Sequence, residues 1–269
     1  MAAASGSGEQ WSSKWGFLLA AVGFAVGMGN IWRFPNVLGQ NGGSAFLFLY
    51  LGCALGIGLP LLITELTIGR RGRSSASGSL VAVANEVGKS TRWGAVGSLG
   101  IFCAFIILSY YTVISGWTLD YFVRAVRGSL QGVDATESAS MFASLLQNPW
   151  LLIFWNTVVH VLIFFVIRQG VQSGLERAVK VLMPALFITL VVMVIYGAIA
   201  GDMAATIKYL LEPDFSEVTF STAMEAIGQA FFSIGIGMGS LIVFGAYLPD
   251  DYSIPGSATA IIFLDTGVA

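Results

Sequence analysis

The stretch that decides the fold reads GFAVGMGNIWRFP and spans residues 23–35. It places glycines, an amide, a guanidinium and a proline inside a long apolar run. Glycines favour an unwound segment, in which free carbonyls ligate cations and free amides meet carboxylates, and a bilayer tolerates such a segment only where it lines a cavity. The alternative is that Gly23 and Gly27 form a small-residue helix-packing face. Asn30 and Arg33 favour the functional interpretation, because an intramembrane Arg needs a partner or a water path.

The composition is that of a membrane protein. Hydrophobic residues make up 56% of the chain and charged residues only 10%, with a mean hydropathy of +0.80. A bilayer core needs about 20 apolar residues per helix, and several runs of that length alternate with short polar loops. A single soluble core is therefore excluded. The basic residues form no dense stripe, so no nucleic-acid partner is expected.

Reading the apolar runs as helices predicts an all-α membrane protein with six complete spans and the start of a seventh. The predicted helices cover residues 15–37, 45–69, 94–123, 150–167, 178–199, 222–248 and, as a start, 254–269. The last run ends at Ala269 before it reaches about 20 residues. Residues 11–269 are thus expected to form an incomplete transmembrane domain that follows a short tail at 1–10.

Charged loops predict the orientation. Basic residues gather after the second and fourth spans: Arg70, Arg71, Arg73, Lys89, Arg92, Arg168, Arg177 and Lys180. Such loops are usually cytoplasmic, which places the tail at 1–10 in the cytoplasm and the protein in the cell membrane. The loop after the fifth span is mostly acidic, as expected of an outer loop: Asp202, Glu212, Asp214 and Glu217 against Lys208.

The sixth span repeats the glycine pattern as QAFFSIGIGMG at residues 229–239. Two glycine-interrupted spans five helices apart are typical of an inverted-repeat transporter, although Gly235 and Gly239 alone would also suit helix packing. Asp265 is expected well inside the seventh helix, where a buried carboxylate needs a cation or hydrogen-bond donors. Glu65 either reaches the cytoplasmic interface or has a partner inside the membrane.

Four motifs closely resemble the neurotransmitter:sodium symporter family: NIWRFP at 30–35, NGG at 41–43, the pair Tyr110-Tyr111, and residues 229–239. The resemblance covers nearly the whole chain from Trp11 onward. It implies the N-terminal portion of a leucine-transporter-like inverted-repeat bundle, whose family members have twelve transmembrane helices. It also implies a sodium-coupled symporter rather than an enzyme, with sodium as coupling ion and no cofactor.

The resemblance assigns residues to sites. Sodium ligands are expected at Gly23, Ala25, Val26, Asn30, Ser233 and Asp265. Substrate-binding positions are expected at Ala25, Met28, Gly29, Ile107, Tyr111, Phe232, Ser233, Gly235 and Met238. Arg33, Phe232 and Tyr111 match gating positions.

Asp265 carries a further expectation. It matches a family asparagine beside the chloride site, near the positions of Tyr50, Gln229 and Ser233. Its fixed charge is therefore expected to replace chloride as well as to ligate sodium.

Gly27 points to the substrate class. Family members that carry monoamines resemble one another in having an aspartate at this position, whereas glycine leaves room for the carboxylate of an α-amino acid. Gly235 and Met238 widen and soften the pocket, which favours hydrophobic or aromatic amino acids. The alternative from another class is a membrane receptor or amino-acid sensor that binds without transport.

The cytoplasmic end departs from the family pattern. Relatives usually carry an Arg shortly before the residue that matches Trp11, where it forms an inner-gate ion pair. This chain has Gly8-Glu9-Gln10 there, and Lys14 is the alternative basic residue. Gly174 and Pro184 match a family motif at the start of the fifth helix, whose unwinding opens an inner water path.

Overall fold

A computed structural model of the chain describes residues 10–27 and 29–269. The described part contains helices and no strand, and it confirms the predicted all-α fold class. It divides into two compact units: a first unit that extends to Ile101 and resumes at Val171, and a second unit from Phe102 to Gly170.

The first unit contains most of the helices. Its N-terminal elements are α1 (Lys14–Ala25), η1 (Gly29–Arg33), α2 (Phe34–Gln40), α3 (Ser44–Cys53), η2 (Ala54–Gly58), α4 (Leu59–Gly72), α5 (Ala76–Glu86) and η3 (Thr91–Trp93). After residue 170 it continues with η4 (Val171–Glu176), α9 (Arg177–Ala200), α10 (Met203–Leu211), η5 (Phe215–Glu217), α11 (Phe220–Ile234), α12 (Ser240–Ala246) and α13 (Ile254–Val268). The second unit holds most of α6 (Gly94–Val126), together with α7 (Ala135–Leu146) and α8 (Pro149–Ile167).

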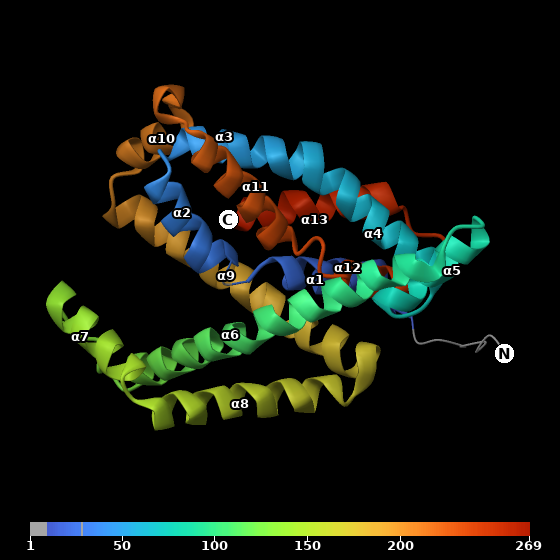
Figure 1. The fold of residues 1–269 in the computed structure, drawn as a ribbon. Coiled ribbons are helices and arrows are strands. Elements are labelled where there is room, and N and C mark those ends of the chain that lie inside the picture. Colours follow the sequence, from blue (N-terminus) through green and yellow to red (C-terminus); the bar gives the residue numbers. More distant parts are fainter. Residues whose placement is uncertain (1–9, 28) are drawn as a thin grey trace. The chain divides into compact units, whose positions relative to one another are not determined.

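Four helical stretches of the described chain are long and apolar enough to cross a membrane: Ser44–Gly72, Thr91–Val126, Pro149–Ile167 and Val171–Ala200. The first of these is α3, η2 and α4 running as one long helix (Figure 1). A fifth span qualifies if α1 and Gly29–Gln40 are counted as one broken span. These two pieces are bent by 43° relative to each other.

The first predicted span is broken near its middle. Ser13 caps the start of α1 by accepting a hydrogen bond from the Gly16 amide at 2.9 Å. The helix ends at Ala25, because Val26 adopts an extended backbone (φ −75°, ψ 105°). Pro35 lies in the first turn of α2, a position at which a helix tolerates the missing N–H of proline.

The sixth predicted span is also broken. The linker 235–239 separates α11 from α12, and three of its glycines have left-handed backbones: Gly235 (φ 75°), Gly237 (φ 85°) and Gly239 (φ 74°). Residues with a Cβ rarely adopt this conformation, which costs them about 1–2 kcal/mol each. Glycine at these positions therefore permits the break.

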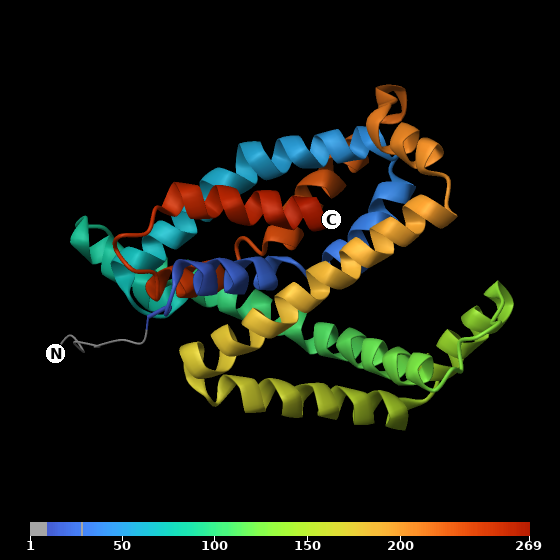
Figure 2. The same cartoon turned by 180° about the vertical axis from the view of Figure 1, so that it is seen from behind.

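The helices around the two breaks pack closely. α13 packs against both α4 and α1, and it lies beside them in both views (Figures 1 and 2). Backbones of α4 and α12 touch, since a Cβ on Gly245 would lie 2.5 Å from the carbonyl oxygen of Leu66 and one on Gly69 would overlap that of Ile242. Small residues allow such approach in membranes, where helix association depends on van der Waals packing rather than water exclusion.

Three short helices lie in regions expected to be loops, namely α5, α7 and α10. Each starts at a side chain that accepts a hydrogen bond from the first turn: Ser75, Asp134 and Asp202 respectively. They are too short to register as apolar spans, so hydropathy did not predict them.

Candidate functional site

Asp265 is the centre of a buried polar cluster in the first unit. Its carboxylate is fully buried, and Asn30 Nδ2 donates to Oδ1 at 2.8 Å and to the Asp265 backbone carbonyl at 3.0 Å. Ser233 Oγ donates to Oδ2 at 2.8 Å, and the Tyr50 hydroxyl donates to the same oxygen at 3.5 Å. These four residues, from η1, α3, α11 and α13, are called the Asp265 cluster.

The cluster lacks a positive side chain. No cationic group of the described residues forms an ion pair with Asp265, whose hydrogen-bond partners are an amide and two hydroxyls. A carboxylate taken out of water needs compensation for its charge, and neutral donors supply only part of it. A small cation bound by the same oxygens would supply the rest.

The break in the first segment is stabilised by Asn30 and leaves backbone carbonyls without helical donors. Asn30 Oδ1 accepts a hydrogen bond from the Gly27 backbone N–H at 3.3 Å, and the Asn30 backbone N–H donates to the Gly27 carbonyl at 3.1 Å. Gly23 and Ala25 belong to the last turn of α1, where carbonyls lose their intrahelical partners. The side chain that stabilises the break is thus also the one that reaches Asp265.

Arg33 and Phe232 lie together on the other side of the break. The Arg33 guanidinium lies over the Phe232 ring, 5.1 Å from its centroid, and also donates to Gln229 Oε1. A Cβ on Gly29 would lie 3.1 Å from Phe232 Cε1. Gly29 therefore lets the ring lie against the backbone of η1.

Phe24 is a neighbour of the linker that sequence reasoning missed. A Cβ on Gly235 would overlap the Phe24 ring and would lie 3.3 Å from Met238 Cε. The three residues meet at the first residue of the linker. Phe24 lies inside the quoted 23–35 stretch, but a single aromatic residue in an apolar run carries no signal of its own.

The remaining predicted substrate positions are placed as follows. Ile107 and Tyr111 belong to the second unit and lie one turn apart, so they share a face of α6. Met28 lies outside the described residues. Ala25 is buried at the end of α1, as is the predicted sodium ligand Val26 that follows it.

Glu65 has a partner inside the fold. Its Oε1 accepts a hydrogen bond from the Gly237 amide at 2.7 Å, which ties α4 to the linker. Its Oε2 is buried without a hydrogen-bond partner in the described part of the chain. Glu65 is half-buried, and it therefore links α4 to the linker.

Glu176 binds the segment before α1, and the sequence did not single it out. Lys14 is exposed and forms no ion pair within the described residues, whereas Ser12 and Lys180 both bond to Glu176. The available signal was the spacing of Glu176 and Lys180, which places opposite charges on one helix face.

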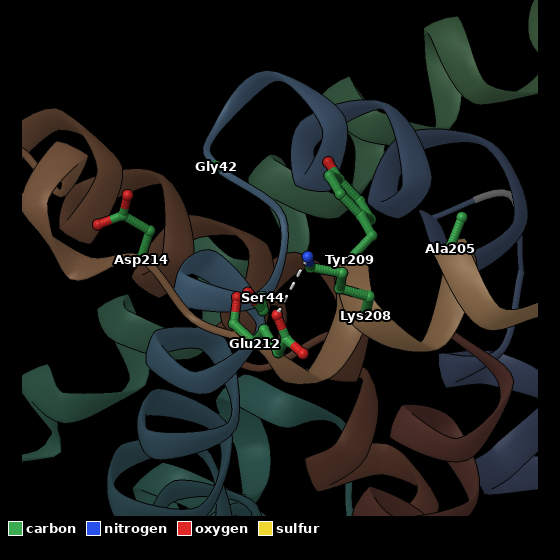
Figure 3. Close-up of a pocket in the computed structure, with 7 residues that line it drawn as sticks. All are labelled: Gly42, Ser44, Ala205, Lys208, Tyr209, Glu212 and Asp214. Atoms are coloured by element: carbon green, nitrogen blue, oxygen red, sulfur yellow. Dashed lines mark hydrogen bonds and ion pairs between the residues drawn. The ribbon is translucent and has the colours of Figure 1, made fainter.

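A separate surface pocket of about 340 Å³ lies between the α2–α3 turn and α10 (Figure 3). It is lined by Gly42, Ser44, Ala205, Lys208, Tyr209, Glu212 and Asp214. Lys208 and Glu212 form a loose, exposed ion pair at 3.8 Å, a type worth little energy. Hydrogen bonds from the hydroxyl and amide of Ser216 lower the pKa of the Asp214 carboxyl. None of the predicted site residues lines this pocket.

Comparison with known proteins identifies the family. A family model described as "Sodium:neurotransmitter symporter family" matches residues 8–141 and 138–268. This chain belongs to the sodium:neurotransmitter symporter family. Membership confirms the resemblance and, with the apolar helices, makes the chain part of a multi-pass membrane protein.

Individual members of the sodium:neurotransmitter symporter family are similar over almost all of this chain. An uncharacterized sodium-dependent transporter of Bacillus subtilis, YhdH, is 37% identical over 256 residues, which cover 95% of this chain and 56% of that protein. An uncharacterized sodium-dependent transporter of Methanocaldococcus jannaschii is 32% identical over 270 residues, covering 96% and 53%. The chain thus spans little more than half the length of these relatives.

A solved family structure shows the same fold. The crystal structure of MhsT in complex with L-phenylalanine matches with a TM-score of 0.89 and 40% identity, over 97% of this chain and 59% of that one. This match confirms the leucine-transporter-like fold class for the described helices. These relatives, and a neutral amino acid transporter of Mus musculus, are named as sodium-dependent transporters.

Proposed function

We propose that this chain provides the sodium- and substrate-binding part of a symporter that moves hydrophobic or aromatic amino acids across the cell membrane without chloride. The observation that carries the proposal is the Asp265 cluster. Its carboxylate is fully buried and is surrounded by neutral donors from η1, α3 and α11.

Sodium is proposed to act as the coupling ion. Its ligands are the positions Gly23, Ala25, Val26, Asn30, Ser233 and Asp265. The proposal is supported by the end of α1 at Ala25, which frees carbonyls of its last turn, and by the link from Asn30 to Asp265. Sodium compensates the charge that neutral donors alone leave uncompensated.

Chloride independence follows from the same carboxylate. Asp265 lies within hydrogen-bond reach of Ser233 and Tyr50, two positions that border the anion site in chloride-dependent relatives. A fixed negative charge there makes a second anion unfavourable by like-charge repulsion in a low dielectric. The carboxylate is proposed to take the place of chloride.

The substrate-binding residues are proposed to be Ala25, Met28, Gly29, Ile107, Tyr111, Phe232, Ser233, Gly235 and Met238, and the gating residues Arg33, Phe232 and Tyr111. Glycine at position 27 leaves room for a substrate carboxylate. The apolar neighbours of the linker, Phe24 and Met238, favour a hydrophobic side chain. The L-phenylalanine in the MhsT complex is consistent with this class.

Transport is proposed to follow alternating access. Sodium binding between the broken helices completes the amino-acid site, and a change of conformation then exposes both to the other side. The tail at 1–10 and the loops after the second and fourth spans are proposed to be cytoplasmic, with residues 11–269 in one transmembrane domain.

Uptake of radiolabelled phenylalanine into proteoliposomes by the full-length protein tests the proposal. We expect accumulation with an inward sodium gradient, unchanged when gluconate replaces chloride. We also expect competition by leucine and tryptophan but not by glycine. An Asn30→Ala variant should lose sodium-dependent uptake.

Three results would contradict parts of this function. Loss of uptake without chloride would exclude the role of Asp265 as its replacement. Preferential competition by glycine would exclude a hydrophobic substrate. Amino-acid binding with no uptake under any gradient would indicate a sensor.

A further inference from the structure

Glu176, directly before α9, binds the residues that precede α1. It is the last residue of η4, and only 1% of it is exposed. Its Oε2 accepts a hydrogen bond from the Ser12 amide at 3.1 Å, and its Oε1 accepts one from the Ser12 hydroxyl. Lys180, one turn along α9, lies 2.7 Å from Oε1 and 3.3 Å from Ser12 Oγ.

Gly16 makes room for this carboxylate. A Cβ built on Gly16 would overlap Oε1, Cδ and Cγ of Glu176. The backbone of α1 therefore lies directly against the Glu176 side chain. No larger residue at this position is compatible with the observed bonds to Ser12.

A second contact of the same kind continues the seam between α1 and α9. A Cβ on Gly23 would lie 3.0 Å from Met183 Sδ and 3.1 Å from Met183 Cγ. Gly16 to Gly23 and Glu176 to Met183 are both seven-residue steps in the same direction. The two helices thus run parallel along a seam in which glycines of α1 receive side chains of α9.

Trp11 secures the same segment to α12. Its amide donates to the Tyr247 carbonyl at 3.3 Å, and its indole Nε1 donates to the Phe244 carbonyl at 3.2 Å. The indole ring packs against Phe17 and Phe244. The segment is therefore bonded on one side to α9 and on the other to α12.

We propose that Ser12, Gly16, Glu176 and Lys180 form an inner lock, in which Glu176 is the positioning residue that keeps α1 against α9. Release of Ser12 from Glu176 is the event that lets α1 leave α9 and exposes the end of α1 to the cytoplasm. The inference rests on the proposed function, since it assumes a transporter with a cytoplasmic N-terminal tail. In this proposal the carboxylate of Glu176, at the end of η4, takes the role expected of a basic residue near Trp11.

Accessibility of a cysteine at Ala20 measures this separation. Ala20 is 2% exposed and lies between Gly16 and Gly23 on the same face of α1. The full-length protein would carry Ala20→Cys with Cys53→Ala and Cys103→Ala, and a methanethiosulfonate reagent would label it in membranes. A charge-assisted hydrogen bond changes an equilibrium about tenfold. We expect Glu176→Ala to raise the labelling rate by about that factor.

Gly16→Ala tests the lock by its geometry. It should raise labelling as Glu176→Ala does, because the added methyl group displaces the carboxylate. In the Glu176→Ala background the same change should add nothing further, since there is no longer a carboxylate to displace. Gly197→Ala is the matched control, because a Cβ there meets no atom within 4 Å, and it should leave labelling unchanged.

Glu176→Gln keeps the shape of the side chain and removes its charge, so it controls for misfolding caused by the loss of the side chain. Its labelling rate should lie between those of the unmodified protein and of Glu176→Ala. The lock is overturned if Glu176→Ala and Glu176→Gln, monodisperse in detergent, label at the unmodified rate. It is also overturned if the two changes at Gly16 and Glu176 are additive. Labelling needs no transport, so failure of uptake by the unmodified protein would refute the proposed function without touching this result.

Discussion

The carboxamide of Asn30 donates hydrogen bonds to both the side chain and the backbone carbonyl of Asp265, at 2.8 and 3.0 Å. The two residues are 235 positions apart in the sequence. The first hydrophobic segment is thus joined to α13 at the point where its helix is broken. A change that weakens one end of this link is expected to be felt at the other.

Asn30→Ala should weaken sodium binding by about tenfold to hundredfold. It removes a hydrogen bond to a charged group, which contributes about 1.5–3 kcal/mol. Sodium titration of amino-acid binding to the purified full-length protein measures the effect. Gln40→Ala, at an exposed amide of α2, is the control and should leave the sodium titration unchanged.

Asp265→Asn should make uptake depend on chloride. The substitution keeps the shape of the side chain but removes the fixed charge, so a free anion becomes the source of compensation. Uptake at equal sodium in chloride and in gluconate gives the comparison. Asp250→Asn, whose side chain is 88% exposed, serves as the control. Equal uptake of the Asp265→Asn variant in both buffers would refute the prediction.

Gly235→Ala should destabilise the protein and shift selectivity toward smaller substrates. The left-handed backbone at φ 75° costs a residue with a Cβ about 1–2 kcal/mol. The new methyl group also displaces the Phe24 ring, at a further cost of about 1–3 kcal/mol. Thermal unfolding in detergent and competition by alanine against tryptophan check both effects. Gly228→Ala in α11 meets open space and should not lower Tm.

Gly43→Ala should lower Tm more than Gly42→Ala. Both glycines have positive φ, 61° and 82°, so both substitutions strain the backbone. Only a Cβ on Gly43 would contact another element, at 2.7 Å from the Tyr209 ring of α10. Removal of that ring by Tyr209→Ala should therefore bring the two Tm changes close together. A difference that persists in that background would show that the contact with α10 is not its cause.

The fold and the break points were readable from the sequence because each leaves a strong local signal. Long apolar runs predict spans, and glycines beside Asn30 and in 229–239 predict interruptions. Asp265 stood out for a simple physical reason, which is that a charge in an apolar run demands a partner. Its actual partners are now Asn30, Ser233 and Tyr50.

The missed residues leave only weak local signals. Glu176 lies in the sequence among Arg168, Arg177 and Lys180, where an acidic residue reads as an ordinary surface group. Its burial depends on Gly16, which is distant in the sequence and is one of many glycines in this chain. Phe24 is one aromatic residue among many. Contacts of this kind are set by tertiary packing and not by local periodicity.

The backbone contact between α4 and α12 at Gly69 and Gly245 has a mechanical consequence. Two helices in such contact have no layer of side chains between them along which they could slide. They therefore move together as one rigid body. Rotation of α11 relative to α4 and α12 then depends on the backbone dihedral angles of the linker 235–239. Its left-handed glycines are the residues whose dihedral angles change most easily. Because Glu65 of α4 bonds the Gly237 amide, the rigid pair also grips the linker at its midpoint. Any rotation of α11 must therefore be absorbed mainly by the two residues before that bond.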